Sequence, residues 1–120
     1  MAKRFVELAE DAGFGNGVLQ LLPGSGRVVG DMLVRDPRTA IVAFTGSKKV
    51  GIKINRQASR VYHRQDRLKE TVLEMGGKNG IIVDTDANLD RAVDGIVRSA
   101  FGYQGQKCSA CSRVIVMEEV

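Results

Sequence analysis

Short apolar runs alternate with amphipathic helical patterns along this chain, and glycine-containing turns separate them. Apolar runs typical of strands occur at residues 18–22, 39–44, 70–75, 80–83 and 113–117. Apolar residues with helical spacing occur at residues 4–13, 27–35, 48–60 and 89–101. Strands that alternate with helices of this length predict an α/β fold with a mostly parallel sheet.

The alternation of strands and helices is incomplete at both ends of the chain. The first helix follows no strand, and the last strand has no helix after it. We therefore expect an internal piece of a longer protein. Within it, Asp86 or Asn88 can cap the helix 89–101. Its predicted inward face consists of Leu89, Ala92, Val93, Ile96, Val97 and Ala100.

The composition is that of a globular protein, with 43% hydrophobic and 27% charged residues. No apolar run approaches the roughly 18 residues that span a membrane. We therefore expect no contact with a membrane. Two cysteines are too few for a disulfide framework, so we expect a cytoplasmic protein. The net charge of +4 permits an anionic partner and does not choose among nucleotide, acidic substrate and nucleic acid.

Cys108 follows a loop rich in glycine and glutamine and stands directly after Lys107. A neighbouring cation favours the thiolate, which is the reactive form of cysteine. The spacing alone favours a buried structural thiol over a nucleophile. Cys108 and Cys111 also form a C-x-x-C pair, but zinc requires about two more ligands and the only histidine is His63. We expect no metal site.

Two further motifs carry possible chemistry. Glu74 ends an apolar strand directly before two glycines, where a partly desolvated carboxylate can act as a general base. An exposed glutamate at a strand end is the simpler interpretation of that position alone. Phe44, Gly46, Ser47 and Gly51 mark a strand–turn–helix junction, whose free N–H groups suit phosphate. Ser47 is a suitable N-cap, although many such turns bind nothing.

A basic series extends beyond this junction. Its members are spaced as one stripe of a long helix: Lys53, Arg56, Arg60, Arg64 and Arg67. The stripe fits either a nucleic-acid-binding face or a solvated surface. A nucleic-acid-binding module is therefore one of the alternatives that the sequence leaves open.

The order of these motifs resembles the aldehyde dehydrogenase superfamily. The chain reads FTGS-x-x-x-G at 44–51, EMGGKN at 74–79 and GQKCSACSR at 105–113, and Glu74 precedes Cys108 by 34 residues. The resemblance extends from the first helix to Val116. Within the superfamily, AFGYQGQKCSACSRVIV and EMGGKNGIIVDTDANLD are most similar to the 1-pyrroline-5-carboxylate dehydrogenases, which are also called L-glutamate γ-semialdehyde dehydrogenases.

The resemblance implies the second half of a Rossmann-like NAD-binding domain, residues 1–75, followed by the start of an α/β catalytic domain, residues 76–120. It implies NAD as cofactor, a small-molecule aldehyde as substrate, no nucleic acid partner and a homo-oligomeric parent enzyme. The implied activity is oxidation of L-glutamate γ-semialdehyde to L-glutamate in proline degradation.

The resemblance also implies roles for individual residues. Cys108 attacks the aldehyde carbon, and Glu74 activates the water that hydrolyses the thioester. The cofactor-binding residues are Phe44, Gly46, Ser47, Gly51 and Met75, with Gly46 and Ser47 near the pyrophosphate. Lys107 and Ser109 contact the substrate, because a cation beside the nucleophile suits an α-carboxylate.

The chain departs from the family pattern in length. Family members are several times longer, and the asparagine that completes their oxyanion hole lies upstream of the residues present here. The alternative is therefore a truncated, catalytically silent chain that at most binds nucleotide or a partner.

Overall fold

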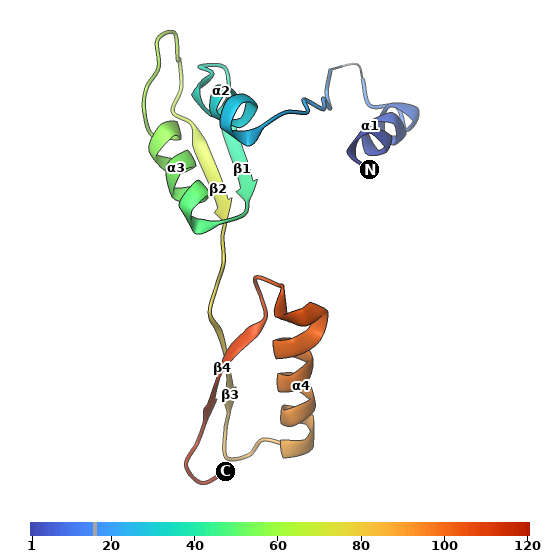
Figure 1. Ribbon diagram of the computed structural model, residues 1–120, viewed down its shortest axis with the longest axis vertical. Helices are drawn as coiled ribbons and strands as arrows, with labels where there is room; N and C mark the ends of the chain where they lie inside the picture. Colours follow the sequence, from blue (N-terminus) through green and yellow to red (C-terminus); the bar gives the residue numbers. More distant parts are fainter. Residues whose placement is uncertain (16) are drawn as a thin grey trace. The chain divides into compact units, whose positions relative to one another are not determined.

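The computed structural model describes residues 1–15 and 17–120. In chain order its elements are α1 (Ala2–Asp11), a π-helical turn (Gly26–Gly30), α2 (Asp31–Arg35), β1 (Ile41–Thr45), α3 (Lys48–Ala58), β2 (Glu70–Glu74), β3 (Asn79–Val83), α4 (Leu89–Phe101), a 3₁₀ turn (Gly102–Gly105) and β4 (Cys111–Val116) (Figure 1). They form two compact units, Met1–Val42 with Ile54–Thr71 and Ala43–Lys53 with Val72–Val120. The predicted α/β class is confirmed.

The strands β1 and β2 form a two-stranded sheet. The Glu70 amide donates to the Ala40 carbonyl (2.8 Å), and the Gly46 amide donates to the Glu74 carbonyl (3.0 Å). The two bonds join residues in the same order along both strands, so the pair is parallel. Parallel neighbours require a long crossover, which α3 and the loop after it provide.

The strands β3 and β4 form a second parallel pair, and α4 is the crossover between them. The predicted helix 89–101 is confirmed at both ends. Of its two candidate caps, Asn88 is the one used, because its Oδ1 accepts from the Arg91 amide at 3.0 Å. The β3–β4 register contains one irregularity. Asn79 pairs with Cys111 and Gly80 with Arg113, which leaves Ser112 as an extra residue.

Few apolar side chains are buried. Among the described residues they are Val34, Ala58, Val83 and Cys111. The predicted inward face of α4 is only partly correct: Ala92, Ile96 and Ala100 are half-buried, whereas Leu89, Val93 and Val97 are exposed. Of the strands, β4 is the one that α4 chiefly contacts. That contact covers one narrow stripe of the helix.

The strand predicted at residues 18–22 is wrong. This segment begins with a turn, in which the Val18 amide donates to Gly15 (3.1 Å), and Gln20 Nε2 donates to the Gly17 carbonyl (3.1 Å). Val18 and Leu22 remain 70% and 62% exposed. An apolar run becomes a stable strand only where neighbouring strands complete its hydrogen bonds, and none pairs with this run within the described structure.

The basic helical stripe is also wrong, because α3 ends at Ala58. Ser59 Oγ donates back to the Asn55 carbonyl (2.8 Å) and the Tyr62 hydroxyl donates to the Gln57 carbonyl (3.1 Å), so side chains satisfy carbonyls in the last turns of the helix. Three of the five cations, Arg60, Arg64 and Arg67, therefore lie in the loop before β2. These cations do not form one helical face.

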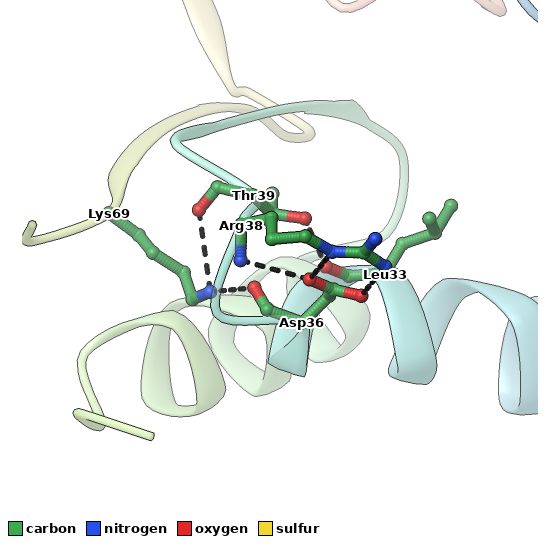
Figure 2. A network of polar contacts seen from close by, with 5 residues as sticks. All are labelled: Leu33, Asp36, Arg38, Thr39 and Lys69. Atoms are coloured by element: carbon green, nitrogen blue, oxygen red, sulfur yellow. Dashed lines mark hydrogen bonds and ion pairs between the residues drawn. The ribbon is translucent and has the colours of Figure 1, made fainter. Parts of the chain in front are cut away.

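A polar network fixes the turn between α2 and β1 (Figure 2). The Asp36 carboxylate accepts from the Arg38 amide (2.9 Å) and from its guanidinium (2.9 and 2.7 Å). The Arg38 guanidinium, followed by its backbone N–H, holds the pKa of Asp36 well below its usual range. Lys69 Nζ donates to the Asp36 carbonyl and to the Thr39 carbonyl (3.3 Å). The network thus connects this turn to the residue that precedes β2.

Candidate active site

The strand–helix junction after β1 has the predicted cap. Ser47 Oγ accepts from the Val50 amide (3.4 Å), and the Ser47 carbonyl accepts the first helical bond of α3 from Gly51 (2.9 Å). The cap uses one of the N–H groups that a helix leaves without internal partners in its first turn. The amides of Lys48 and Lys49 precede it, and both side chains are exposed. This end of α3 is therefore able to bind an anion.

Gly46 connects this junction to the end of β2. Its amide donates to the Glu74 carbonyl at 3.0 Å. A Cβ at this position would lie 2.5 Å from Cζ of Phe44, so the aromatic ring occupies the space that a side chain would need. Any larger residue here would force the Phe44 ring or the backbone to move.

Gly51 makes a second close approach. It is buried in α3, and a Cβ added to it would lie 2.6 Å from Sδ of Met75. The structure thus brings five of the predicted residues together where β1 and β2 end: Phe44, Gly46, Gly51, Glu74 and Met75. Glu74 itself is exposed.

Cys108 lies at the corner of a tight turn. The Ala110 amide donates to the Lys107 carbonyl (3.1 Å), which places Cys108 and Ser109 at its two central positions. Lys107, Cys108 and Ser109 are all exposed. The turn therefore presents the thiol between a cation and a hydroxyl.

The second thiol has a different environment. Cys111 is 7% exposed, its amide donates to Ser99 Oγ (3.1 Å), and its thiol donates to the Arg113 carbonyl (3.2 Å). The described part of the chain contains no group of three or more His, Cys, Asp or Glu side chains placed to hold a metal. The C-x-x-C pair thus consists of one exposed and one buried structural thiol.

The approach to Cys108 is a left-handed segment. Tyr103, Gln104 and Gly105 have φ values of 55°, 58° and 71°. A Cβ on Gly105 would lie 2.9 Å from the Ala100 carbonyl oxygen, and the Gln106 amide donates to Tyr103 (3.0 Å). The helix α4 ends at Phe101 with Gly102 as its C-cap, and these left-handed residues then redirect the chain toward Cys108.

Two residues that the sequence did not single out contact the Cys108 turn. A Cβ on Gly77 would lie 3.2 Å from the Cys108 carbonyl oxygen, and Asn79 Nδ2 donates to that same oxygen at 2.6 Å. The sequence contained a usable signal. If strands 80–83 and 113–117 are parallel neighbours, the residues just before each strand must lie side by side.

The described contacts hold Glu74 and Cys108 in separate clusters. Glu74 belongs to the end of the β1–β2 pair, and Cys108 belongs to the turn before β4. Residues 75–78, which form neither helix nor strand, connect β2 to β3. The predicted cofactor-binding residues and the predicted nucleophile therefore belong to two groups of contacts, which residues 75–78 separate along the chain.

These features define the class of protein. The chain belongs to the aldehyde dehydrogenase family, whose model matches residues 1–120. The 1-pyrroline-5-carboxylate dehydrogenase of Geobacillus sp. (strain WCH70) is 53% identical over 120 residues, which are 100% of this chain and 23% of that protein. The enzyme of the same name from Bacillus subtilis (strain 168) is 51% identical over the same shares.

Solved structures give the same result. The Thermus 1-pyrroline-5-carboxylate dehydrogenase with bound NAD is 46% identical, has a TM-score of 0.88, and matches over 97% of this chain and 22% of that one. Proline utilization A from Bdellovibrio bacteriovorus, inactivated by N-propargylglycine, is 50% identical with a TM-score of 0.90, over 99% of this chain and 12% of that one.

The match covers a small part of each relative. The chain spans 23% of the length of the 1-pyrroline-5-carboxylate dehydrogenases from Geobacillus and Bacillus subtilis. Over residues 1–15 and 17–120, the helices are too short or too polar for any of them to cross a membrane.

Proposed function

We propose that this chain supplies the nucleophile, the general base and part of the cofactor site of an NAD-dependent dehydrogenase. Its substrate is L-glutamate γ-semialdehyde, the open form of 1-pyrroline-5-carboxylate, which it oxidises to L-glutamate in proline degradation. The observation that carries the proposal is the exposed Cys108 thiol between Lys107 and Ser109, in contrast to the buried thiol of Cys111. The names of the relatives and the bound NAD of the Thermus enzyme support it.

The junction after β1 fits a dinucleotide. Backbone N–H groups at the N-terminus of α3, next to Gly46 and Ser47, would donate hydrogen bonds to the pyrophosphate, whereas the Gly46 N–H itself donates to the Glu74 carbonyl. Phe44 and Gly51 keep α3 close to the end of β2, because no side chain separates Gly51 from Met75. The Met75 backbone would hold the nicotinamide amide. NAD, when bound, would supply the hydride acceptor for the substrate carbon.

Cys108 performs the first half of the reaction. Its thiolate sulfur forms a bond to the aldehyde carbon, and the carbonyl electron pair moves onto oxygen to give a thiohemiacetal. The Cys108 backbone N–H donates to that oxygen as part of an oxyanion hole. Loss of hydride from the same carbon re-forms the carbonyl and leaves a thioester on Cys108.

Glu74 performs the second half. Its carboxylate takes a proton from a water molecule as the water oxygen attacks the thioester carbon. The carbon–sulfur bond breaks, the electron pair returns to Cys108 as thiolate, and the carboxylic acid leaves. Both steps use the same sulfur, which explains why one exposed thiol is sufficient.

Lys107 and Ser109 give the substrate preference. They flank Cys108 and are exposed, so an ammonium and a hydroxyl are available on either side of the nucleophile. An α-carboxylate on the substrate accepts charge-assisted hydrogen bonds from such groups. An aldehyde without the carboxylate lacks this interaction.

The proposed division into an NAD-binding part, residues 1–75, and a catalytic part, residues 76–120, rests on the family resemblance; the two compact units are drawn differently, since Ala43–Lys53 belongs with Val72–Val120. The β1–β2 and β3–β4 pairs are separate sheets, and residues 75–78 between them are irregular. The division thus separates the cofactor junction from the nucleophile turn.

The test uses a grafted enzyme. This is the full-length Geobacillus (strain WCH70) relative in which the matching segment is replaced by residues 1–120 of this chain. Cys108→Ala should abolish NADH formation from the semialdehyde, because no nucleophile remains. Cys111→Ala is the matched control, since it removes the other thiol, and it should retain turnover. Retained turnover in the Cys108 variant would refute the proposal.

Glu74→Gln tests the second half of the reaction. The amide cannot accept the proton of water, so acylation should proceed while hydrolysis slows. Rapid mixing should then give a burst of NADH followed by a slow steady state. Glu70→Gln is the control, because Glu70 is an exposed glutamate at the other end of the same strand. Equal loss of burst and steady state would exclude Glu74 as the base of hydrolysis.

A further inference from the structure

The Cys108 turn is attached to β3 by a side chain rather than by the sheet ladder. At the register irregularity, Asn79 faces Cys111, Gly80 faces Arg113, and Ser112 is the extra residue. Asn79 Nδ2 donates to the Cys108 carbonyl (2.6 Å) and to the Ala110 carbonyl (3.4 Å). Both acceptors are oxygens, so the amide must present its NH₂ to them. A single carboxamide thus contacts two residues of the turn that carries the thiol.

The surroundings of Asn79 keep it in this position. Ser112 Oγ donates to the Asn79 carbonyl (3.3 Å), and an Arg113 guanidinium N–H donates to the Lys78 carbonyl (2.6 Å). Gly77 leaves the necessary space, since a Cβ there would lie 3.2 Å from the Cys108 carbonyl oxygen and 3.3 Å from Asn79 Oδ1. The backbone on both sides of the carboxamide is therefore fixed.

We propose that Asn79 is a positioning residue for the nucleophile, because its carboxamide sets the placement of the turn that presents the Cys108 thiol. This inference rests on the proposed function of Cys108. Attack on a bound aldehyde requires the sulfur within a narrow range of distance and direction, and a misplacement of about 1 Å can slow such a step by roughly 100-fold. Alkylation by a small, freely diffusing reagent has no comparable requirement.

Asn79 is exposed, so an effect of its substitution on the position of Cys108 can be distinguished from an effect on the stability of the fold. Water replaces an exposed hydrogen bond at little cost to the folded state, so the variant should fold normally. Asn79→Asp keeps the shape of the side chain and removes its NH₂ donors. Asn79→Ala removes the whole group without adding charge. The matched control is Asn88→Asp, because Asn88 contributes only an acceptor, to the Arg91 amide, which a carboxylate also provides.

The measurement is single-turnover NADH formation by the grafted enzyme in excess over the semialdehyde. Iodoacetamide labelling of Cys108 and Cys111 is followed separately by peptide mass spectrometry. Both Asn79 variants should lower the rate constant by roughly 10- to 100-fold at unchanged amplitude. The labelling rate of Cys108, the protection of Cys111 and the unfolding midpoint should not change. Asn88→Asp should match the parent throughout.

Three results would overturn the inference. The first is an unchanged rate constant in both Asn79 variants. The second is a lower amplitude at unchanged rate constant with faster labelling of Cys111, which indicates partial unfolding. The third is an effect of Asn79→Asp alone, which indicates the introduced charge. A Cys108→Ala enzyme that still forms NADH refutes the proposed function instead, so the two failures are distinguishable.

Discussion

Gly51→Ala tests the packing of α3 against the residue that follows Glu74. The added methyl carbon would lie 2.6 Å from Sδ and 3.0 Å from Cγ of Met75. Comfortable contacts between such atoms are roughly 3.5–4.0 Å, so Met75 or the helix must move by about 1 Å. Overpacking of this kind costs about 1–3 kcal/mol, whereas alanine in place of glycine inside a helix gains roughly 1 kcal/mol. The expected net loss of unfolding free energy is about 0–2 kcal/mol.

The sign of this effect should depend on Met75. In a Met75→Ala background the obstructing atoms are absent, so Gly51→Ala should stabilise by up to about 1 kcal/mol. Urea unfolding of the grafted enzyme, followed by far-ultraviolet circular dichroism, gives the four members of this cycle. The coupling between the two positions should be about 1–3 kcal/mol. The Michaelis constant for NAD should rise in Gly51→Ala, because the Met75 backbone is proposed to lie near the nicotinamide.

Gly95→Ala is the matched control. Gly95 lies inside α4, and a Cβ there has no heavy atom within 4 Å, so only the helix-propensity gain of roughly 1 kcal/mol should appear. An equal change in stability on Gly51→Ala with and without the Met75 side chain would refute the proposed clash. Stabilisation by Gly51→Ala equal to that by Gly95→Ala would also refute it.

Two further predictions concern the network around Asp36. Asp36→Asn should lower the urea midpoint at neutral pH. Because the folded-state pKa of Asp36 is depressed, the stabilising contribution is complete above the unfolded value of about 3.9 and is lost as the pH falls below it. The difference from the parent should therefore shrink in acid; a pH-independent difference would contradict the ion-pair explanation. Lys69→Met should cost about 1–2 kcal/mol, since two backbone carbonyls lose a charged donor at a half-buried position. Lys49→Met, at an exposed position, is its control, and equal effects of the two substitutions would contradict the role of Lys69 in the network.

The parts of the fold that the sequence predicted are those with local signals. Asn88 and Gly102 bound α4, and Ser47 caps α3, so these helices begin and end where short-range hydrogen bonds require. The predictions that were wrong concern segments whose secondary structure depends on contacts with other parts of the chain. The run at residues 18–22 has the composition of a strand and lacks a neighbour. The stripe after Ala58 requires a helix that Ser59 and Tyr62 help to end.

The candidate site was predicted from the order of its motifs, and its internal contacts were not. The 2.6 Å bond between Asn79 and Cys108 joins residues 29 positions apart, and only the pairing of β3 with β4 brings them together. The left-handed backbone of Tyr103 and Gln104 could not be predicted from the sequence either, because residues with a Cβ rarely adopt this conformation. The family resemblance identified Cys108, but it did not identify the hydrogen bonds and close backbone contacts that hold the Cys108 turn.

The extra residue at Ser112 divides the segment before β4 into two parts that should differ in their tolerance of length changes. Deletion of Ser112 would place Cys111 directly before Arg113, and Asn79 with Cys111 and Gly80 with Arg113 would then pair in an unbroken ladder. A change of length between Cys108 and Cys111 has a different effect, because it would shift Cys108 away from the Asn79 carboxamide that contacts its carbonyl. Insertions and deletions should therefore be rarer between Cys108 and Cys111 than at Ser112 among relatives that share this pairing.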